Sequence, residues 1–218
     1  MPDKSWKRKL EKKVKDYLKD YPACHDFYHH DRTKKYALEI AKKVKCDEDI
    51  VYAGALIHDI GYKGNELDDL RHNHYGMKLA KEWLSRIGFP LEKIDNVLEV
   101  IRLHDNVSWA DDHEPTEHVE VKIVQDADRL DNLGAIDMAR LSYYFGERGL
   151  PIYNPAKVGR TKRLFLHHSL LDQMNRSPMK SWKNLNFTAS RSISKKRYEL
   201  TRKIYENLKK ELEETHLK

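Results

Sequence analysis

The chain has 218 residues, of which 39% are hydrophobic and 35% are charged, a balance typical of a folded protein with a well-hydrated surface. No apolar run reaches the ~18 residues needed to cross a bilayer, and the first residues lack the apolar stretch of a signal peptide, so we expect a cytoplasmic protein with no membrane partner. Two cysteines, Cys24 and Cys46, are too few for a disulfide scaffold or a cysteine-based zinc site.

The net charge of +6 is compatible with phosphate-bearing partners. The basic residues are spread along the chain, however, and they are interleaved with acids, as in KRKLEKKVKD. We therefore expect no dedicated nucleic-acid surface. The sequence shows no internal repeat and no Gly/Ser linker, so a single domain is the resulting prediction.

The first half of the chain predicts a series of helices. A lysine-rich amphipathic helix carries its inner stripe from Trp6 to Leu18, and a second helix is expected over residues 31–44. Asp47 is the expected N-cap of a third helix, which reads IVYAGALIH. Because this third helix is apolar on every side, it should be buried on every side.

A loop that contains Gly61 and Gly64 follows the buried helix. A helix is then expected over residues 71–87, and Gly88 is its predicted C-terminal stop. Pro90 suits the first position of the next helix, which should run to His104.

The second half of the chain also reads as helical. A polar loop, NVSWADDHEPTEH, leads into VEVKIVQDADRLD, whose apolar stripe fits a helix better than a strand despite its β-branched residues. A loop is expected over residues 146–157, and helices over residues 161–174 and 192–217, with an irregular segment between these two. No convincing strand pair is present, so we predict an all-α protein.

The histidine–aspartate pair at the end of the third predicted helix needs an explanation. His58 and Asp59 follow the apolar run GALI, and buried polar or charged groups require partners. Neighbouring residues on a helix project about 100° apart, so both side chains can reach one point beyond the helix end. Two interpretations are open: a mutual hydrogen bond that caps the helix, which the pair alone favours, and a shared divalent cation.

Two further segments favour the cation. HDFYHHDR offers His25, His29 and His30 beside the second predicted helix, and QDADRLD places Asp126 at the edge of an apolar helix face. One imidazole, the histidine–aspartate pair and one more carboxylate would then come from three buried helices and leave open positions for water. Such a site, without thiolate, suits the divalent transition metals Mn, Fe, Co, Ni and Zn, and it suits Mg less well.

These motifs resemble those of the HD superfamily of metal-dependent phosphohydrolases, whose ligands follow the order H…HD…D. HDFYHHDR resembles the first motif of the family, H-D-x-x-H-x-x-R, which implies that His29 is the first ligand. LIHDIG resembles the signature that supplies His58 and Asp59. DADRLDNLGAI resembles the segment whose leading aspartate is the last ligand, which is Asp126 here.

The resemblance implies an HD-domain helical bundle with a C-terminal helical extension. It places the metal-binding core at residues 20–145 and the extension at residues 160–218, within one domain that covers residues 1–218. HHSLLDQM and the basic helix that follows are similar to the tail of a small stand-alone branch of the family. The connection over residues 174–186 departs from the shorter one expected for that branch.

Additional histidines lie near the predicted ligands in the sequence. RHNHYG is similar to an H-x-x-x-G segment found in HD enzymes, which points to His72, with His74 as its competitor and a candidate contact with substrate. His104 ends a helix at a matching place. We expect His72 or His104 to enter the site as a catalytic residue, and surface imidazoles are the alternative. A complete second metal site is not expected, because the HH pair and the GYP segment of the two-metal signalling branch are absent.

Three cationic residues are candidates to bind substrate phosphate. Phosphoryl transfer gathers negative charge on the phosphate oxygens, which nearby cations stabilise. Arg32 follows the first predicted ligand by one turn, Lys63 lies in the loop after the buried helix, and Arg129 follows the last predicted ligand. Arg32 and Arg129 also admit structural roles, and Lys63 also admits simple solvation.

The predicted function is that of a metal-dependent phosphohydrolase acting on a small phosphorylated molecule, with a nucleotide as the preferred substrate class. The branch that the chain resembles suggests hydrolysis of a nucleoside triphosphate to a monophosphate and pyrophosphate. The alternatives are a 5′-nucleotidase, a phosphodiesterase and a non-catalytic nucleotide-sensing HD module. A homodimer is compatible with the sequence.

Overall fold

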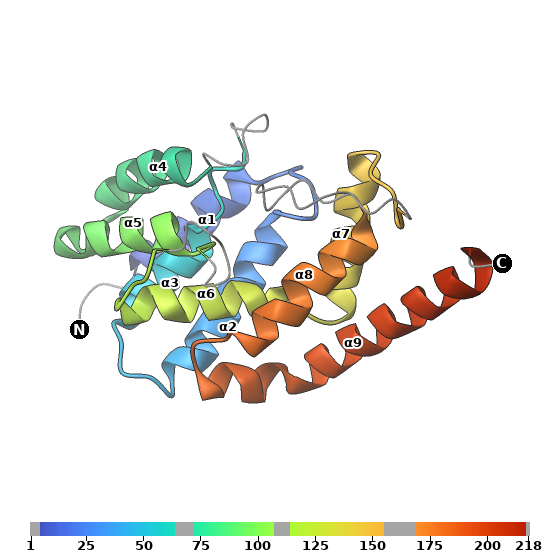
Figure 1. Ribbon diagram of the computed structural model, residues 1–218. Coiled ribbons are helices and arrows are strands. Elements are labelled where there is room, and N and C mark those ends of the chain that lie inside the picture. Colours follow the sequence, from blue (N-terminus) through green and yellow to red (C-terminus); the bar gives the residue numbers. More distant parts are fainter. Residues whose placement is uncertain (1–4, 64–71, 107–113, 155–168, 217–218) are drawn as a thin grey trace. The chain divides into compact units, whose positions relative to one another are not determined.

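The structure, a computed structural model, describes residues 5–63, 72–106, 114–154 and 169–216 (Figure 1). In these ranges every regular element is a helix, which confirms the predicted all-α class. None of the described helices has the length and apolarity required to cross a membrane. In chain order the elements are α1 (Ser5–Tyr17), α2 (Phe27–Ala41), α3 (Glu48–Ile57), α4 (His72–Ile87), the 3₁₀ helix η2 (Leu91–Lys93), α5 (Ile94–Leu103), α6 (Val119–Asp131), α7 (Ala135–Glu147), α8 (Leu170–Lys183) and α9 (Thr188–His216).

The described residues divide into two compact units. The first contains α1 to α5 and the part of α6 that ends at Asp128, and the second contains the chain from Arg129 onward, with α7, α8 and α9. All four predicted metal ligands lie in the first unit. That the whole chain acts as a single domain stays a prediction.

Helix α3 is the centre of the first unit, and all its residues from Ile50 to Ile57 are buried. It packs against α1, α2 and α5. Asp47 caps the helix as predicted, because its carboxylate accepts hydrogen bonds from the backbone N–H groups of its first turn. A helix held on all sides in this way fixes the position of the residues that follow its last turn.

Helix α6 runs parallel to α3. Near its start, Glu120 accepts a hydrogen bond of 2.8 Å from the backbone N–H of Asp47, which precedes α3. Near its end, Asp128 lies beside His58, which follows α3. The side chain of Gln125 donates to a backbone carbonyl at the end of α5 at 2.8 Å. The C-terminal ends of α3, α5 and α6 therefore meet in one place.

Two helices begin earlier than predicted. Helix α2 begins at Phe27 instead of residue 31, because Asp26 acts as its N-cap and accepts from the backbone N–H of His29 at 2.9 Å. Helix α9 begins at Thr188 instead of residue 192. Gly88 ends α4 as predicted, with a φ of 85° that favours glycine. The earlier start of α2 places His29 inside a helix, where its side chain direction is fixed.

Helix α8 corrects the prediction of an irregular segment over residues 174–187, because the chain is helical as far as Lys183. Pro178 lies inside the helix and has no N–H, so the carbonyl of Met174 loses its usual donor. Burial of one face outweighs this loss: buried residues keep a helical spacing through the proline, at Leu170, Met174, Pro178 and Ser181. The predicted start of this helix, over residues 161–168, lies outside the described residues.

Candidate metal centre

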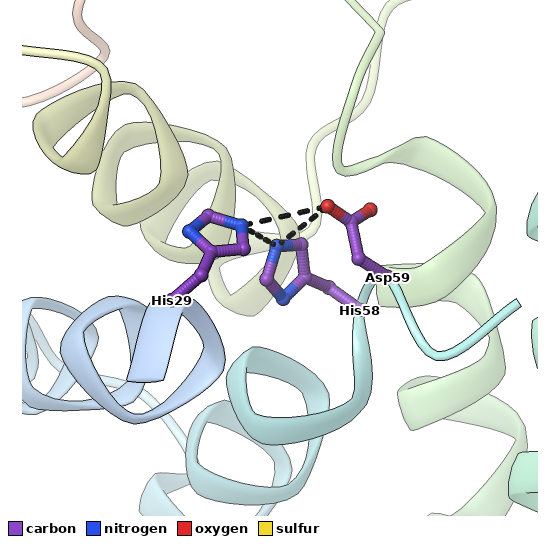
Figure 2. A group of neighbouring side chains, drawn as sticks. All are labelled: His29, His58 and Asp59. Carbon is purple, nitrogen blue, oxygen red and sulfur yellow. Dashed lines mark hydrogen bonds and ion pairs between the residues drawn. The ribbon is translucent and has the colours of Figure 1, made fainter. Parts of the chain in front are cut away.

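Three of the predicted ligands meet in the first unit. Figure 2 shows His29 on α2 and, from the end of α3, His58 and Asp59, with two ring nitrogens and a carboxylate oxygen turned toward one another. The Nε2 atoms of His29 and His58 are 3.2 Å apart. The Oδ2 atom of Asp59 lies 3.5 Å from the first nitrogen and 3.3 Å from the second. All three residues are buried.

A further carboxylate reaches this cluster from Asp128 on α6. Its Oδ1 atom lies 3.5 Å from His29 Nε2 and 3.7 Å from His58 Nε2. The predicted ligand Asp126 is fully buried two residues earlier on the same helix. Side chains two residues apart project about 200° apart around a helix, so the two carboxylates cannot both face these imidazoles. Asp128 was absent from the ligands predicted from the sequence, although DADRLD contains it.

The tautomer of His58 is set by the helix on which it lies. Its Nδ1–H donates to the backbone carbonyl of Ala55 at 2.9 Å, which leaves Nε2 to face the cluster. His30 lies behind the cluster, with its Nδ1–H donated to the carbonyl of Leu56 at 2.9 Å. Burial, together with the imidazoles of His58 and His29, holds the pKa of His30 well below its ordinary value. His30 is therefore a neutral ring that supports the cluster from behind.

The carboxylates of the cluster are ionised. Burial alone would raise the pKa of Asp59, but the imidazoles of His58 and His104 outweigh it and hold that pKa well below its ordinary value. Burial also opposes the charge on His58, yet the carboxylates of Asp59 and Asp128 raise its pKa to about 10. The two carboxylates therefore favour a positive charge at this buried position, as is expected of a site that binds a cation.

The spacing of these groups fits a divalent transition metal. Ligand atoms about 2.1 Å from a metal ion lie about 3.0 Å apart at an octahedral angle and about 3.4 Å apart at a tetrahedral angle. The five separations given above range from 3.2 to 3.7 Å. Two imidazole nitrogens with carboxylate oxygens suit Mn, Fe, Co, Ni or Zn. His29, His58 and Asp59 could therefore hold a metal ion, and Asp128 is placed to complete the set.

The second oxygen of Asp59 faces two more histidines, His72 and His104, both of which are buried. His104 Nε2 lies 2.8 Å from Asp59 Oδ1, and His72 Nε2 lies 3.6 Å from it. The other ring nitrogen of His104 donates to a backbone carbonyl at 2.8 Å, so both its nitrogens face acceptors. Although burial disfavours the charge, the carboxylate of Asp59 raises the pKa of His104. The two histidines predicted to be catalytic thus lie beside the candidate metal centre.

Two residues outside the predicted set also border the cluster. His25 Nε2 lies 3.9 Å from Asp59 Oδ2, and its side chain is partly exposed. Asp105 Oδ2 lies 3.8 Å from His72 Nε2. His25 opens the motif HDFYHHDR, so the sequence does offer it beside His29, whereas nothing in the sequence distinguishes Asp105 from a surface residue. His74, in contrast, is exposed on α4, two residues beyond His72 and turned away from it.

The predicted phosphate-binding cations have different surroundings. The ammonium group of Lys63 donates to the backbone carbonyl of Tyr17 and thereby caps the end of α1, and the hydroxyl of Tyr17 donates back to the carbonyl of Lys63 at 2.5 Å. Arg129 is buried in the second unit, where it donates to the carbonyl of Asn184 at 3.2 Å. Arg32 is partly exposed on α2. Lys63 and Arg129 therefore have structural partners.

Comparison with known proteins decides the family. Residues 26–133 match the model of the HD domain family. A relative from Bacillus subtilis (strain 168), YpgQ, is 31% identical over an alignment of 171 residues, and the alignment covers 74% of this chain and 77% of YpgQ. The chain belongs to the HD domain family. This confirms the family suggested by the motifs HDFYHHDR, LIHDIG and DADRLDNLGAI.

Solved structures share the fold of this HD-domain chain. YpgQ of Bacillus subtilis in complex with ADP matches with a TM-score of 0.73 and 24% identity, over 97% of both chains. An HD-superfamily hydrolase from Bacillus thuringiensis matches with a TM-score of 0.67 and 28% identity, over 94% of this chain and 95% of the other. A protein from Lactobacillus plantarum matches with a TM-score of 0.78 and 21% identity, over 97% and 98%.

Proposed function

We propose that this HD-domain chain is a metal-dependent phosphohydrolase that acts on a small phosphorylated molecule, and that this molecule is a nucleotide. The observation that carries the proposal is the buried cluster of His29, His58, Asp59 and Asp128. Two proteins of similar structure support the proposal. One is an HD-superfamily hydrolase, and the other, YpgQ, has been crystallised with the nucleotide ADP.

The proposed ligands are His29, His58, Asp59 and Asp128, with Asp128 in place of the predicted Asp126. The N–H donated by His58 to the backbone keeps its Nε2 atom available, and the buried helix α3 fixes the direction of both His58 and Asp59. A divalent ion held by these residues supplies a bound water of lowered pKa and polarises a phosphoryl oxygen.

His72 and His104 are the proposed catalytic residues. They lie at the oxygen of Asp59 that faces away from His29, and that carboxylate raises the pKa of His104. From there the two rings would stabilise negative charge on the phosphoryl oxygens and donate a proton to the leaving group. Contact of Arg32, Lys63, Arg129 or His74 with substrate phosphate stays a prediction.

The specific reaction proposed is hydrolysis of a nucleoside triphosphate to a monophosphate and pyrophosphate. Water adds to the α-phosphorus, and the bond from that phosphorus to the oxygen bridging to the β-phosphorus breaks. A 5′-nucleotidase would instead release inorganic phosphate from a monophosphate, and a phosphodiesterase would open a diester. A sensor would bind nucleotide without turnover. The products of the reaction therefore separate the alternatives.

A substrate panel tests the proposal. Purified protein is incubated with nucleoside mono-, di- and triphosphates and with cyclic nucleotides, in the presence of Mn²⁺ or Co²⁺, and the products are identified by ³¹P NMR. The variant Asp59→Asn keeps the shape of the side chain and removes its charge, and Asp95→Asn on the exposed surface of α5 is the matched control. We expect loss of turnover only in Asp59→Asn. Nucleotide binding without turnover under every metal would favour the sensor.

A further inference from the structure

Three aromatic rings form a continuous stack beside the candidate metal centre. The ring of Tyr62 lies between two imidazoles: its centroid is 4.1 Å from that of His25, with an angle of 16° between the planes, and 4.0 Å from that of His72, with an angle of 9°. The rings come from three segments, because His25 precedes α2, Tyr62 follows α3, and His72 begins α4. The stack therefore joins the parts of the chain that surround Asp59.

Both outer rings of the stack face the same carboxylate. His25 Nε2 lies 3.9 Å from Asp59 Oδ2, and His72 Nε2 lies 3.6 Å from Asp59 Oδ1. Neither separation is short enough for a hydrogen bond, so the carboxylate by itself does not fix the direction of either ring. Parallel contact with Tyr62 on both faces does restrict these rings, because each imidazole can tilt only by moving the phenol.

The backbone around Tyr62 is held firmly against α4. The backbone N–H of Tyr62 donates to the carbonyl of Asp59 at 3.1 Å, which closes a tight turn. Gly61 lies so close to α4 that a Cβ atom there would be 1.9 Å from the carbonyl oxygen of His72 and 2.6 Å from the nitrogen of Gly76. This close approach brings the neighbouring ring of Tyr62 onto the face of His72.

We propose that Tyr62 is a positioning residue that holds the imidazoles of His25 and His72 on opposite sides of Asp59, so that both face the phosphate groups of a bound substrate. The statement that both imidazoles face substrate phosphate rests on the proposed function. None of the four proposed metal ligands is in the stack, so Tyr62 should act without changing the binding of metal by His29, His58, Asp59 and Asp128. Because the aromatic ring holds the two imidazoles, a phenylalanine at this position should preserve their positions, whereas an aliphatic side chain should not.

The stack is tested directly by NMR of the full chain loaded with diamagnetic Zn²⁺ and labelled with ¹³C at histidine and tyrosine. Nuclear Overhauser contacts are expected from the Tyr62 ring protons to the ring protons of both His25 and His72. The resonances of these two histidines should move downfield in Tyr62→Leu, where the ring current is lost, and keep their positions in Tyr62→Phe. Absence of the contacts in the wild-type chain overturns the proposal, and this result needs no variant to fold.

Kinetics with Mn²⁺ and the nucleotide found in the substrate panel test the consequence. We expect Tyr62→Leu to lower kcat by about 10- to 100-fold, the size of effect that misplaced groups produce, while the affinity for Mn²⁺ is unchanged. Tyr62→Phe should restore kcat, and Tyr143→Leu, which removes an exposed tyrosine on α7, should have no effect. Full kcat in a folded Tyr62→Leu variant overturns the positioning role. If the wild-type chain has no turnover, the proposed function fails, and the NMR result decides the stack alone.

Discussion

His29 and His58 lie on different helices, and their Nε2 atoms are 3.2 Å apart. Two imidazole nitrogens at this distance either share a proton or bind a common cation. Because ionised carboxylates from Asp59 and Asp128 face the same two nitrogens, a cation satisfies all four groups together.

The choice of Asp128 over Asp126 as a ligand is testable by paired substitutions. Asp128→Asn should weaken Mn²⁺ binding by at least about 10- to 100-fold, because the loss of even an outer partner of a metal ligand has an effect of that size. Asp126→Asn should weaken it much less, since its carboxylate leaves the helix on another side. Isothermal titration calorimetry measures both affinities. If only Asp126→Asn weakened Mn²⁺ binding, Asp126 would be the ligand, as the sequence predicted.

Gly61→Ala should displace the first turn of α4 and lower activity. The added Cβ would meet backbone atoms of His72 and Gly76, which cannot move aside as a flexible side chain can, so a cost of about 1–3 kcal/mol is expected. Gly146→Ala on α7 is the control, because no atom lies within 4 Å of its added Cβ. This change should be neutral or stabilising by up to about 1 kcal/mol. Urea unfolding measures both, and equal effects would refute the close approach.

Gly54 and Val100 should be coupled through the packing of α3 on α5. A Cβ at Gly54 would lie 2.7 Å from Val100 Cγ1, so Gly54→Ala should destabilise the chain by about 1–3 kcal/mol. Val100→Ala removes the atom in conflict, and the penalty of Gly54→Ala should shrink in that background. A double-mutant cycle on unfolding free energies measures the coupling. If the effects of the two substitutions on the free energy of unfolding were strictly additive, α3 and α5 would instead move apart to accommodate the added methyl group.

Lys34 should contribute to stability in a pH-dependent way. Its side chain is only 8% exposed, and it pairs with Glu11 and Asp31. Burial alone would raise the pKa of Glu11, but hydrogen bonds from Lys34 and Tyr52 lower it below its usual 4.5. Ionised Glu11 therefore stabilises the fold above about pH 4.5, and this contribution is lost as the pH falls through the lowered pKa.

The matched test of this pair compares Lys34→Met with Lys35→Met. We expect Lys34→Met to lower the free energy of unfolding by about 1–3 kcal/mol at pH 7. The loss should be smaller at acidic pH, where the wild-type chain has lost the same interaction. Lys35 is 67% exposed and pairs only at the surface, so its removal should cost about 0.5 kcal/mol or less. Chemical unfolding at several pH values measures both. A cost for Lys34→Met that stays constant down to acidic pH would contradict the assignment.

The first half of the candidate site follows directly from local sequence pattern. The run GALI before His58 and Asp59 is apolar on every side, which requires a buried helix and places both side chains at its end. Asp47 likewise marks the start of that helix through an ordinary capping preference. Features of this kind depend on neighbours in the chain, so a single sequence suffices to predict them.

Other features depend on the rotation of a helix about its axis. Asp126 and Asp128 are two residues apart, as are His72 and His74, and only the packing of each helix on its neighbours decides which member of each pair faces the cluster. The stack of Tyr62 on His25 and His72 joins three distant segments, so it leaves no local pattern. The helix through Pro178 was predicted wrongly because the burial of its neighbours outweighs the local preference of proline.

The most direct test of the central claim is a metal titration of nucleotide hydrolysis. Protein stripped of metal is supplied with increasing Mn²⁺, and both the bound metal and the rate of nucleoside triphosphate hydrolysis are measured on the same samples, for the wild-type chain and for Asp59→Asn. We predict that hydrolysis rises with bound metal, saturates near one ion per chain, and is lost in the variant together with metal binding. Full hydrolysis by the stripped protein, or by folded Asp59→Asn, would contradict the claim.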